Sequence, residues 1–390
     1  MSSLRSFIFV TVVILVTLGG GFWLMDLTRP PEPLSPELAT PKLSMAQIAP
    51  SQHTKPLFFT MAALPYVKEH WEEWGKAFRS PALLAEEIAV PCEAALQSVE
   101  SWNVIDRKWR FGTLLLMGDP AYFRPLLEYL RMSPEWTLTQ LDPTSLVFER
   151  APARAWTTAN LAQLLAVFQT HSATEQRTAR ISIAHRLMYL KEVPTAKKLL
   201  EEVLKTDSTS KQAWTEMAQL QGMQGEWQES LVAAERALAT ENRYRPAQLA
   251  QAQAFYSLGS FNKALDVTRG LYQAAPADLP TLLLHAKVTH AAHAFMEEID
   301  VLQRMIALLE ANSRPVGPWQ VYLGQAYASA GNSSVAGDLF KTALKDETLS
   351  DAQRAYVQKF LDRMDTKSDL LNIGPAFPES SLLDAAEYRP

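Results

Sequence analysis

Residues 245–276 read RPAQLAQAQAFYSLGSFNKALDVTRGLYQAAP, and the spacing within this stretch recurs along the chain. Ala264 is a small residue in its second half. Ser230 stands 34 positions earlier, and Ala196 stands another 34 positions before that. A fixed period of this length is typical of repeat architectures in which each unit is one supersecondary motif. The pattern after Trp156 is helical, so the period predicts a string of helical hairpins.

The copies share a frame of small and aromatic residues. Small residues on both helices of a hairpin let the helices approach closely, and aromatic residues fill the remaining space. The frame comprises Trp214, Ala218, Gly225, Trp227, Ser230 and Ala237 in the second copy; Ala252, Phe255, Gly259, Phe261, Ala264, Leu271 and Pro276 in the third; and Leu323, Gly324, Tyr327, Gly331, Ala336, Phe340 and Ala343 in the last. These residues resemble the tetratricopeptide repeat (TPR), and the likeness covers about residues 177–349. The resemblance implies an α-solenoid that holds another protein.

The fourth copy, residues 279–314, departs from the frame. His293 stands where glycine usually turns the chain, and Glu298 replaces the small residue of the second helix. The distance from there to the next small residue, Ala336, is 38 positions, so about four additional residues are present. We expect them to widen the loop around residues 313–318.

The solenoid is predicted to span residues 156–366. Its last part, residues 351–364, reads as a helix with a polar face, which suits the cap that keeps such arrays soluble. A small α/β module is predicted for residues 102–150, in the order strand, helix, strand, strand. A further helical segment is predicted for residues 61–101. The predicted fold class is therefore mostly α.

Local signals place the elements of the α/β module. An apolar run at residues 112–117 has the length of a strand, and Asp119 followed by proline is a typical helix start. Residues 142–144, Asp-Pro-Thr, read as the turn of a hairpin. The carboxylate of Asp119 also has the position of a site residue after a strand, but capping a helix accounts for it. Asp106 and Glu128 have no partner that the sequence can place.

The N-terminus predicts a membrane anchor. Residues 7–25 contain no charge and nearly span a hydrocarbon core of about 30 Å as a helix. A cleaved signal peptide has a shorter apolar run and a small-residue cleavage site, which we do not find here. We expect a cytoplasmic tail at residues 1–6, a Pro-rich linker at residues 26–60 and a flexible tail at residues 367–390. The protein would be single-pass in the inner membrane, contacting lipid through the anchor, with its soluble part in a bacterial periplasm.

Composition and motifs argue against several functions. The net charge of −5 does not suit a nucleic-acid binder. Cys92 is the only cysteine, so no intrachain disulfide and no thiolate metal cage can form. His285 and His290 would point about 140° apart on one helix; only His290 and His293 are neighbours, and two imidazoles alone make a weak metal site. We therefore predict no catalytic residue, no metal and no cofactor.

The TPR resemblance implies a concave groove lined by set positions of the first helix in each repeat. Carried over residue by residue, these positions are His185, Met188, Tyr189, Thr215, Gln219, Met223, Gln253, Tyr256, Lys287, His290 and Gln325. Lys287 is the only formal cation among them, so the lysine and asparagine clamp that grips chaperone tails is missing. Amide, phenol and thioether side chains suit an extended peptide held by hydrogen bonds and apolar contacts.

Two classes of function follow. The first is a membrane-tethered scaffold or adaptor that binds partner proteins or extended peptides of the cell envelope. The second is an envelope enzyme or accessory subunit, related to glycan or glycosyl transfer, with a ligand site in residues 102–150. The two differ in whether Trp102, Trp109 and Trp136 are buried or line an open cleft with Asp106 or Asp119.

Overall fold

The computed structural model describes residues 57–63, 67, 95–96, 98–150, 155–311, 316–346, 349 and 351–365. The predicted anchor, the predicted tail at residues 367–390, Cys92 and most of the predicted helical segment 61–101 lie outside this part of the chain. Among the described helices, none combines the length and the apolar character that a membrane span requires.

The N-terminal module is built on a four-stranded sheet of order β1-β2-β4-β3. The sheet and its helices comprise β1 (Leu57–Phe59), η2 (Met61–Ala63), α6 (Val99–Trp109), β2 (Thr113–Met117), η4 (Pro120–Phe123), α7 (Arg124–Met132), β3 (Trp136–Leu141) and β4 (Ser145–Arg150). The predicted order of strand, helix, strand, strand is present. β1 is additional: it pairs in parallel with β2, with Leu57 opposite Thr113. The linker predicted to reach residue 60 therefore ends earlier, because its last residues belong to the sheet.

Side-chain hydrogen bonds place the turns of this module. Asp142 Oδ1 accepts hydrogen bonds from the backbone N–H groups of Thr144 and Ser145, at 2.8 and 2.7 Å. This closes the predicted turn between the antiparallel strands β3 and β4. Asp119 Oδ1 accepts from the backbone N–H of Ala121 at 2.9 Å and caps η4, as the Asp-Pro pair predicts.

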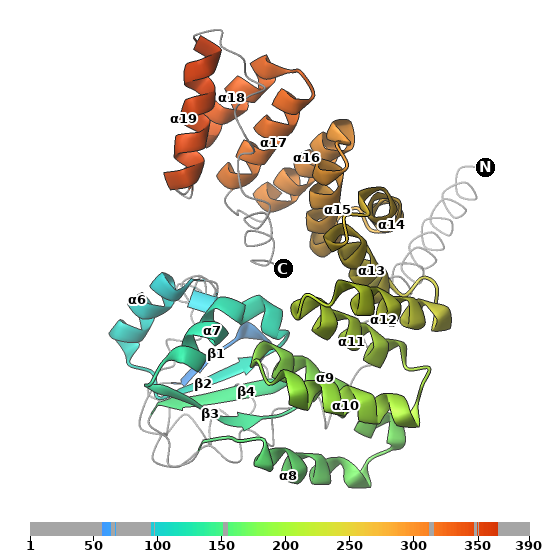
Figure 1. The fold of residues 1–390 in the computed structure, drawn as a ribbon. Helices are drawn as coiled ribbons and strands as arrows, with labels where there is room; N and C mark the ends of the chain where they lie inside the picture. Colours follow the sequence, from blue (N-terminus) through green and yellow to red (C-terminus); the bar gives the residue numbers. More distant parts are fainter. Residues whose placement is uncertain are drawn as a thin grey trace, which may run out of the picture.

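An aromatic cluster forms the core of the module. The Trp102 ring lies against Phe58, Phe111 and Trp136, with centroid separations of 5.2, 5.8 and 6.0 Å. These rings come from α6, from β1, from the segment that leads into β2 and from β3, so they join the helix to the sheet. The same apolar core continues into the first two helical hairpins, and Figure 1 shows α9 beside the sheet.

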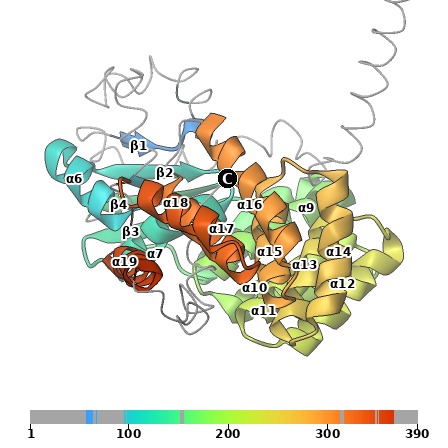
Figure 2. The same cartoon turned by 90° about the horizontal axis from the view of Figure 1, so that it is seen from above.

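The C-terminal part is an array of consecutive helical hairpins. It follows α8 (Ala159–Val167) and η5 (Phe168–Thr170) and comprises the pairs α9 (Ala173–Tyr189) and α10 (Val193–Thr206), α11 (Lys211–Met223) and α12 (Trp227–Thr240), α13 (Arg245–Ser257) and α14 (Phe261–Ala274), α15 (Leu279–Ala291) and α16 (Phe295–Ala311), α17 (Gly317–Ser329) and α18 (Ser333–Ala343), with α19 (Asp351–Asp365) last. The hairpins follow one another along a curved path (Figure 1). Seen from above, the sheet lies on one side of the molecule, and α11 to α14 lie on the other (Figure 2).

A left-handed residue turns the chain in every hairpin. In the five hairpin turns, the residues with positive φ are Lys191, Gly225, Gly259, His293 and Gly331, at 64°, 80°, 74°, 55° and 86°. The first four are spaced by 34 residues and the last by 38, so the turn keeps the period of the sequence. His293 adopts this conformation although it is not glycine, at a cost that the packing of both helices has to offset.

The four additional residues of the fourth repeat lie mainly in a helix, not in a wider loop as expected. α16 has 17 residues, whereas α10, α12 and α14 have 14 each. Five positions separate α16 from α17, compared with four between α14 and α15. An apolar helix is extended at little cost because each added residue adds a backbone hydrogen bond.

Candidate peptide-binding groove

The first helices of successive hairpins pack against one another. α9 contacts α11, α11 contacts α13, and α13 contacts α15. They therefore form a continuous layer along one side of the array, and equivalent positions follow one another along it. Gln219, Gln253 and Gln325 occupy one such position, in the second, third and fifth hairpins, and their side chains are half-buried.

The structure leaves most of the predicted groove residues partly accessible. Those that are half-buried or exposed are His185, Tyr189, Gln219, Met223, Gln253, Tyr256, His290 and Gln325. Three others are buried, with exposed fractions of 0% for Met188, 2% for Thr215 and 5% for Lys287. The prediction that these three side chains line an accessible groove is wrong, because helical spacing alone does not reveal what packs over each side chain.

The accessible polar side chains are already oriented by neighbours. Gln253 Nε2 donates a hydrogen bond to Ser257 Oγ at 3.2 Å. The Tyr256 ring lies 5.7 Å from the Phe261 ring, centroid to centroid. His290 Nδ1 lies 2.9 Å from a carboxylate oxygen of Glu298. These contacts restrict the rotamers in advance, which lowers the entropy that a bound peptide would cost.

At the first hairpin, the module covers the predicted groove position. His185 on α9 lies between two carboxylates: Nδ1 is 2.8 Å from Glu216 Oε2 on α11, and Nε2 is 3.2 Å from Asp119 Oδ1. Burial disfavours the charged imidazole, but the two carboxylates outweigh it and raise the pKa of His185 to about 10. Both ring nitrogens therefore carry protons at neutral pH and donate to the carboxylates.

Arg186 makes a second link between solenoid and module. Its Nη2 donates to the backbone oxygen of Gly118 at 3.0 Å. Burial lowers the pKa of Arg186 to about 10, and the carboxylates of Asp142 and Asp119 oppose this shift. The turn after β2 thus packs against α9.

This contact was not visible in the sequence. Asp119 caps a helix, as its Asp-Pro pair predicts, but it also pairs with His185, 66 residues later. An arginine and a histidine side by side on a helix give no signal of a long-range partner unless the fold is known.

The three histidines of the fourth hairpin have contacts within that hairpin or with its neighbour. His285 Nδ1 lies 2.9 Å from Thr268 Oγ1, and burial lowers the pKa of His285 to about 4, so the ring is neutral at physiological pH. His290 pairs with Glu298, and His293 forms the left-handed turn. Across the described residues, no group of three or more metal-ligating side chains converges.

The tryptophans of the module are core residues. Trp102 and Trp136 have exposed fractions of 0% and 4%, and Trp109 is half-buried. Asp106 is bound by Arg150 Nη2 through both carboxylate oxygens, at 2.7 and 2.6 Å, and the same guanidinium stacks 4.5 Å from the Trp136 ring. These residues do not form the open cleft that a ligand-binding module requires.

No family model matches the chain, and no curated protein matches it. The chain is similar to TTC0263, a thermophilic TPR protein of Thermus thermophilus, with 18% identity and a TM-score of 0.36 over 47% of this chain and 97% of that one. YrrB, described as a TPR protein with an unusual peptide-binding site, matches with 15% identity and a TM-score of 0.38 over 50% and 93%. A MamA fragment from Desulfovibrio magneticus RS-1 matches with 15% identity and a TM-score of 0.39 over 45% and 97%. The TPR-like character of the array rests on its own hairpins and their 34-residue period.

Proposed function

We propose that this protein is a scaffold that holds an extended segment of a partner protein along the first helices of hairpins two to five. The observation that carries the proposal is that Gln219 and Gln253 hold equivalent positions on the contacting helices α11 and α13, with Tyr256 one turn further along α13. Gln325 holds the same position on α17, two hairpins beyond Gln253. A glutamine side chain both donates and accepts hydrogen bonds, so a row of them can pair with a peptide backbone of any sequence.

The chemistry of this groove favours modest affinity and broad tolerance of sequence. Lys287, its only formal cation, is buried. The accessible side chains therefore suit amide hydrogen bonds and apolar contacts, and Tyr256 is the expected anchor because aromatic residues dominate binding energy at interfaces.

The proposal includes a membrane tether. Residues 7–25, which are uncharged, would anchor the chain in the inner membrane with the groove in the periplasm. Membranes washed with alkaline carbonate should retain the protein, and a phosphatase fused to the C-terminus should be active. Release into the wash, or a mature N-terminus mapped downstream of Asp26, would contradict the tether while leaving the groove untouched.

Site-specific crosslinking tests the groove. A photoreactive amino acid at position 253 in intact cells should capture a partner, whereas the same group at exposed Gln273 on α14 should not. A peptide from the captured segment should then bind the purified chain, and Gln253→Ala with Tyr256→Ala should weaken that binding about tenfold. Equal capture from both positions would contradict the groove. Binding that survives both alanine substitutions and is lost on deleting residues 102–150 would place the site on the module.

A further inference from the structure

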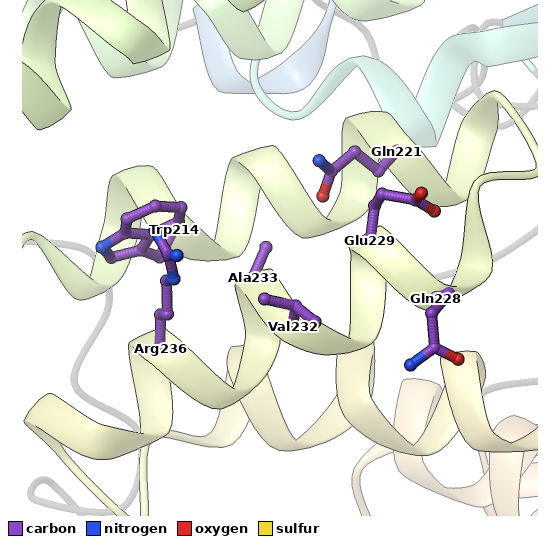
Figure 3. Close-up of a pocket in the computed structure, with 7 residues that line it drawn as sticks. All are labelled: Trp214, Gln221, Gln228, Glu229, Val232, Ala233 and Arg236. Atoms are coloured by element: carbon purple, nitrogen blue, oxygen red, sulfur yellow. The ribbon is translucent and has the colours of Figure 1, made fainter.

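A pocket lies between α11 and α12, lined on one side by Trp214 and Gln221 and on the other by Glu229, Val232 and Arg236 (Figure 3). Its volume is about 300 Å³. The side chains are both apolar and charged, unlike those of the amide-lined groove.

The pocket faces away from the proposed groove. At 3.6 residues per turn, Gln221 lies only about 20° around α11 from Trp214, whereas Gln219 lies about 140° from it. A ligand in the pocket therefore touches a different side of α11 than a peptide in the groove. The two sites can be tested independently.

Arg236 is held in place by stacking, and the edge of its guanidinium is available to a ligand. Its guanidinium stacks 4.5 Å from the Trp214 ring, and Trp214 Nε1 donates to the backbone oxygen of Ser208 at 2.8 Å, which fixes the ring. Within the described part of the chain, no carboxylate pairs with Arg236. A guanidinium stacked in this way keeps its edge available for a bidentate carboxylate.

The remaining lining residues define what else the ligand must offer. Gln221 lines the pocket, and its Oε1 is buried without a hydrogen-bond partner, so a donor that enters beside it would satisfy this oxygen. Val232 is 43% exposed, which is high for an apolar side chain on a folded helix. Glu229 stands at the opposite end from Arg236.

These residues have a common spacing along α12. Glu229, Val232 and Arg236 are separated by three and four positions, so they share one face of the helix. Seven residues at about 1.5 Å each place Arg236 roughly 10 Å along the axis from Glu229. An extended peptide covers that distance in about three to four residues, and every second side chain lies on the same side of it.

We propose that this pocket binds a short extended peptide whose acidic residue pairs with Arg236 and whose apolar residue two positions later packs on Val232. A cation four positions after the acid meets Glu229, and a backbone N–H between them pairs with Gln221. The opposite charges at the two ends of the pocket set the register of this peptide.

Fluorescence anisotropy with the full-length chain in detergent tests this site. The probe is a labelled peptide, Gly-Glu-Ala-Leu-Ala-Lys-Gly, whose glutamate, leucine and lysine share one side when it is extended, and we expect saturable binding. Arg236→Gln should weaken it about tenfold. Arg243→Gln, which removes the same charge from a nearby exposed position, should have no effect. A probe with glutamine in place of glutamate should bind the wild type about tenfold more weakly and should lose little more with Arg236→Gln, because both changes remove one pair.

Three outcomes would overturn the proposal. They are the absence of saturable binding at millimolar peptide, equal loss for Arg236→Gln and Arg243→Gln, and loss of probe binding on Gln253→Ala. The last result would mean that the probe binds in the groove on the other side of α11. None of these three outcomes tests whether a partner is captured at position 253.

Discussion

The close approach of the two helices in the last hairpin predicts opposite effects for two glycine-to-alanine substitutions. A Cβ added at Gly324 would lie 2.5 Å from Phe340 Cε1 and 2.9 Å from Cδ1. Ordinary contact begins near 3.4 Å, so the ring must move by about 1 Å. Phe340 is fully buried, and its ring lies 4.6 Å from that of Phe360 in α19, so it has no free space to enter.

The magnitude follows from two opposing terms. Overpacking costs about 1–3 kcal/mol, and the better helix propensity of alanine returns up to about 1 kcal/mol. We therefore expect Gly324→Ala to lower the free energy of unfolding by roughly 1–2 kcal/mol, which corresponds to a fall in Tm of about 2–8 °C. Gly270 in α14 is the matched control, because a Cβ there has no neighbour within 4 Å. Gly270→Ala should raise the free energy of unfolding by roughly 0.5–1 kcal/mol.

Thermal and urea unfolding of the full-length chain in detergent, followed by circular dichroism, measures both changes. Hydrogen exchange should locate the loss in α17 and α18, since contacts in such arrays are between neighbours. If Gly324→Ala is as stable as Gly270→Ala, the two helices do not approach as closely as the packing argument requires.

The remaining predictions concern stability and pH. Ala264→Leu should overpack its hairpin and cost about 1–3 kcal/mol, whereas Lys263→Leu on the outer face should cost far less in the same unfolding measurement; equal losses would refute the repeat register. At pH values below 6.5, His185→Gln should lower the Tm relative to the wild type. This difference in Tm should vanish as the pH rises through about 10, because folding raises the pKa of His185 and its contribution to stability is lost when the ring deprotonates. A Tm difference independent of pH would show that its charge does not hold the module. Asp106→Asn should destabilise the module by about 1–3 kcal/mol, because it removes one of two carboxylates that pair with the buried Arg150 guanidinium and leaves Glu135 as the other. Glu128→Gln, at an exposed pair, should change stability by less than about 1 kcal/mol; similar values would mean that the buried pair is solvated.

The helical hairpins could be predicted because their determinants are local. Each hairpin packs on its neighbours, so Gly259 and Ala264 have the same roles as Gly225 and Ser230 one period earlier. The turn at His293 follows the same logic: its place in the period indicates a left-handed residue, although its side chain does not. The turn at Asp142 and the cap at Asp119 were also predictable, because their hydrogen bonds reach only two or three residues ahead.

Tertiary structure decided the rest. β1 joins the sheet through β2, 56 residues later in the chain, and its three residues are too few to show a strand pattern. The pair of Asp119 with His185 and the pair of Asp106 with Arg150 join residues 66 and 44 positions apart. Helical period places side chains on a face, but it does not reveal what covers that face. For this reason the period predicts Met188 and Lys287 in the groove, although the fold buries both side chains. The pocket at Arg236 likewise depends on the packing of α11 against α12, which the sequence does not show.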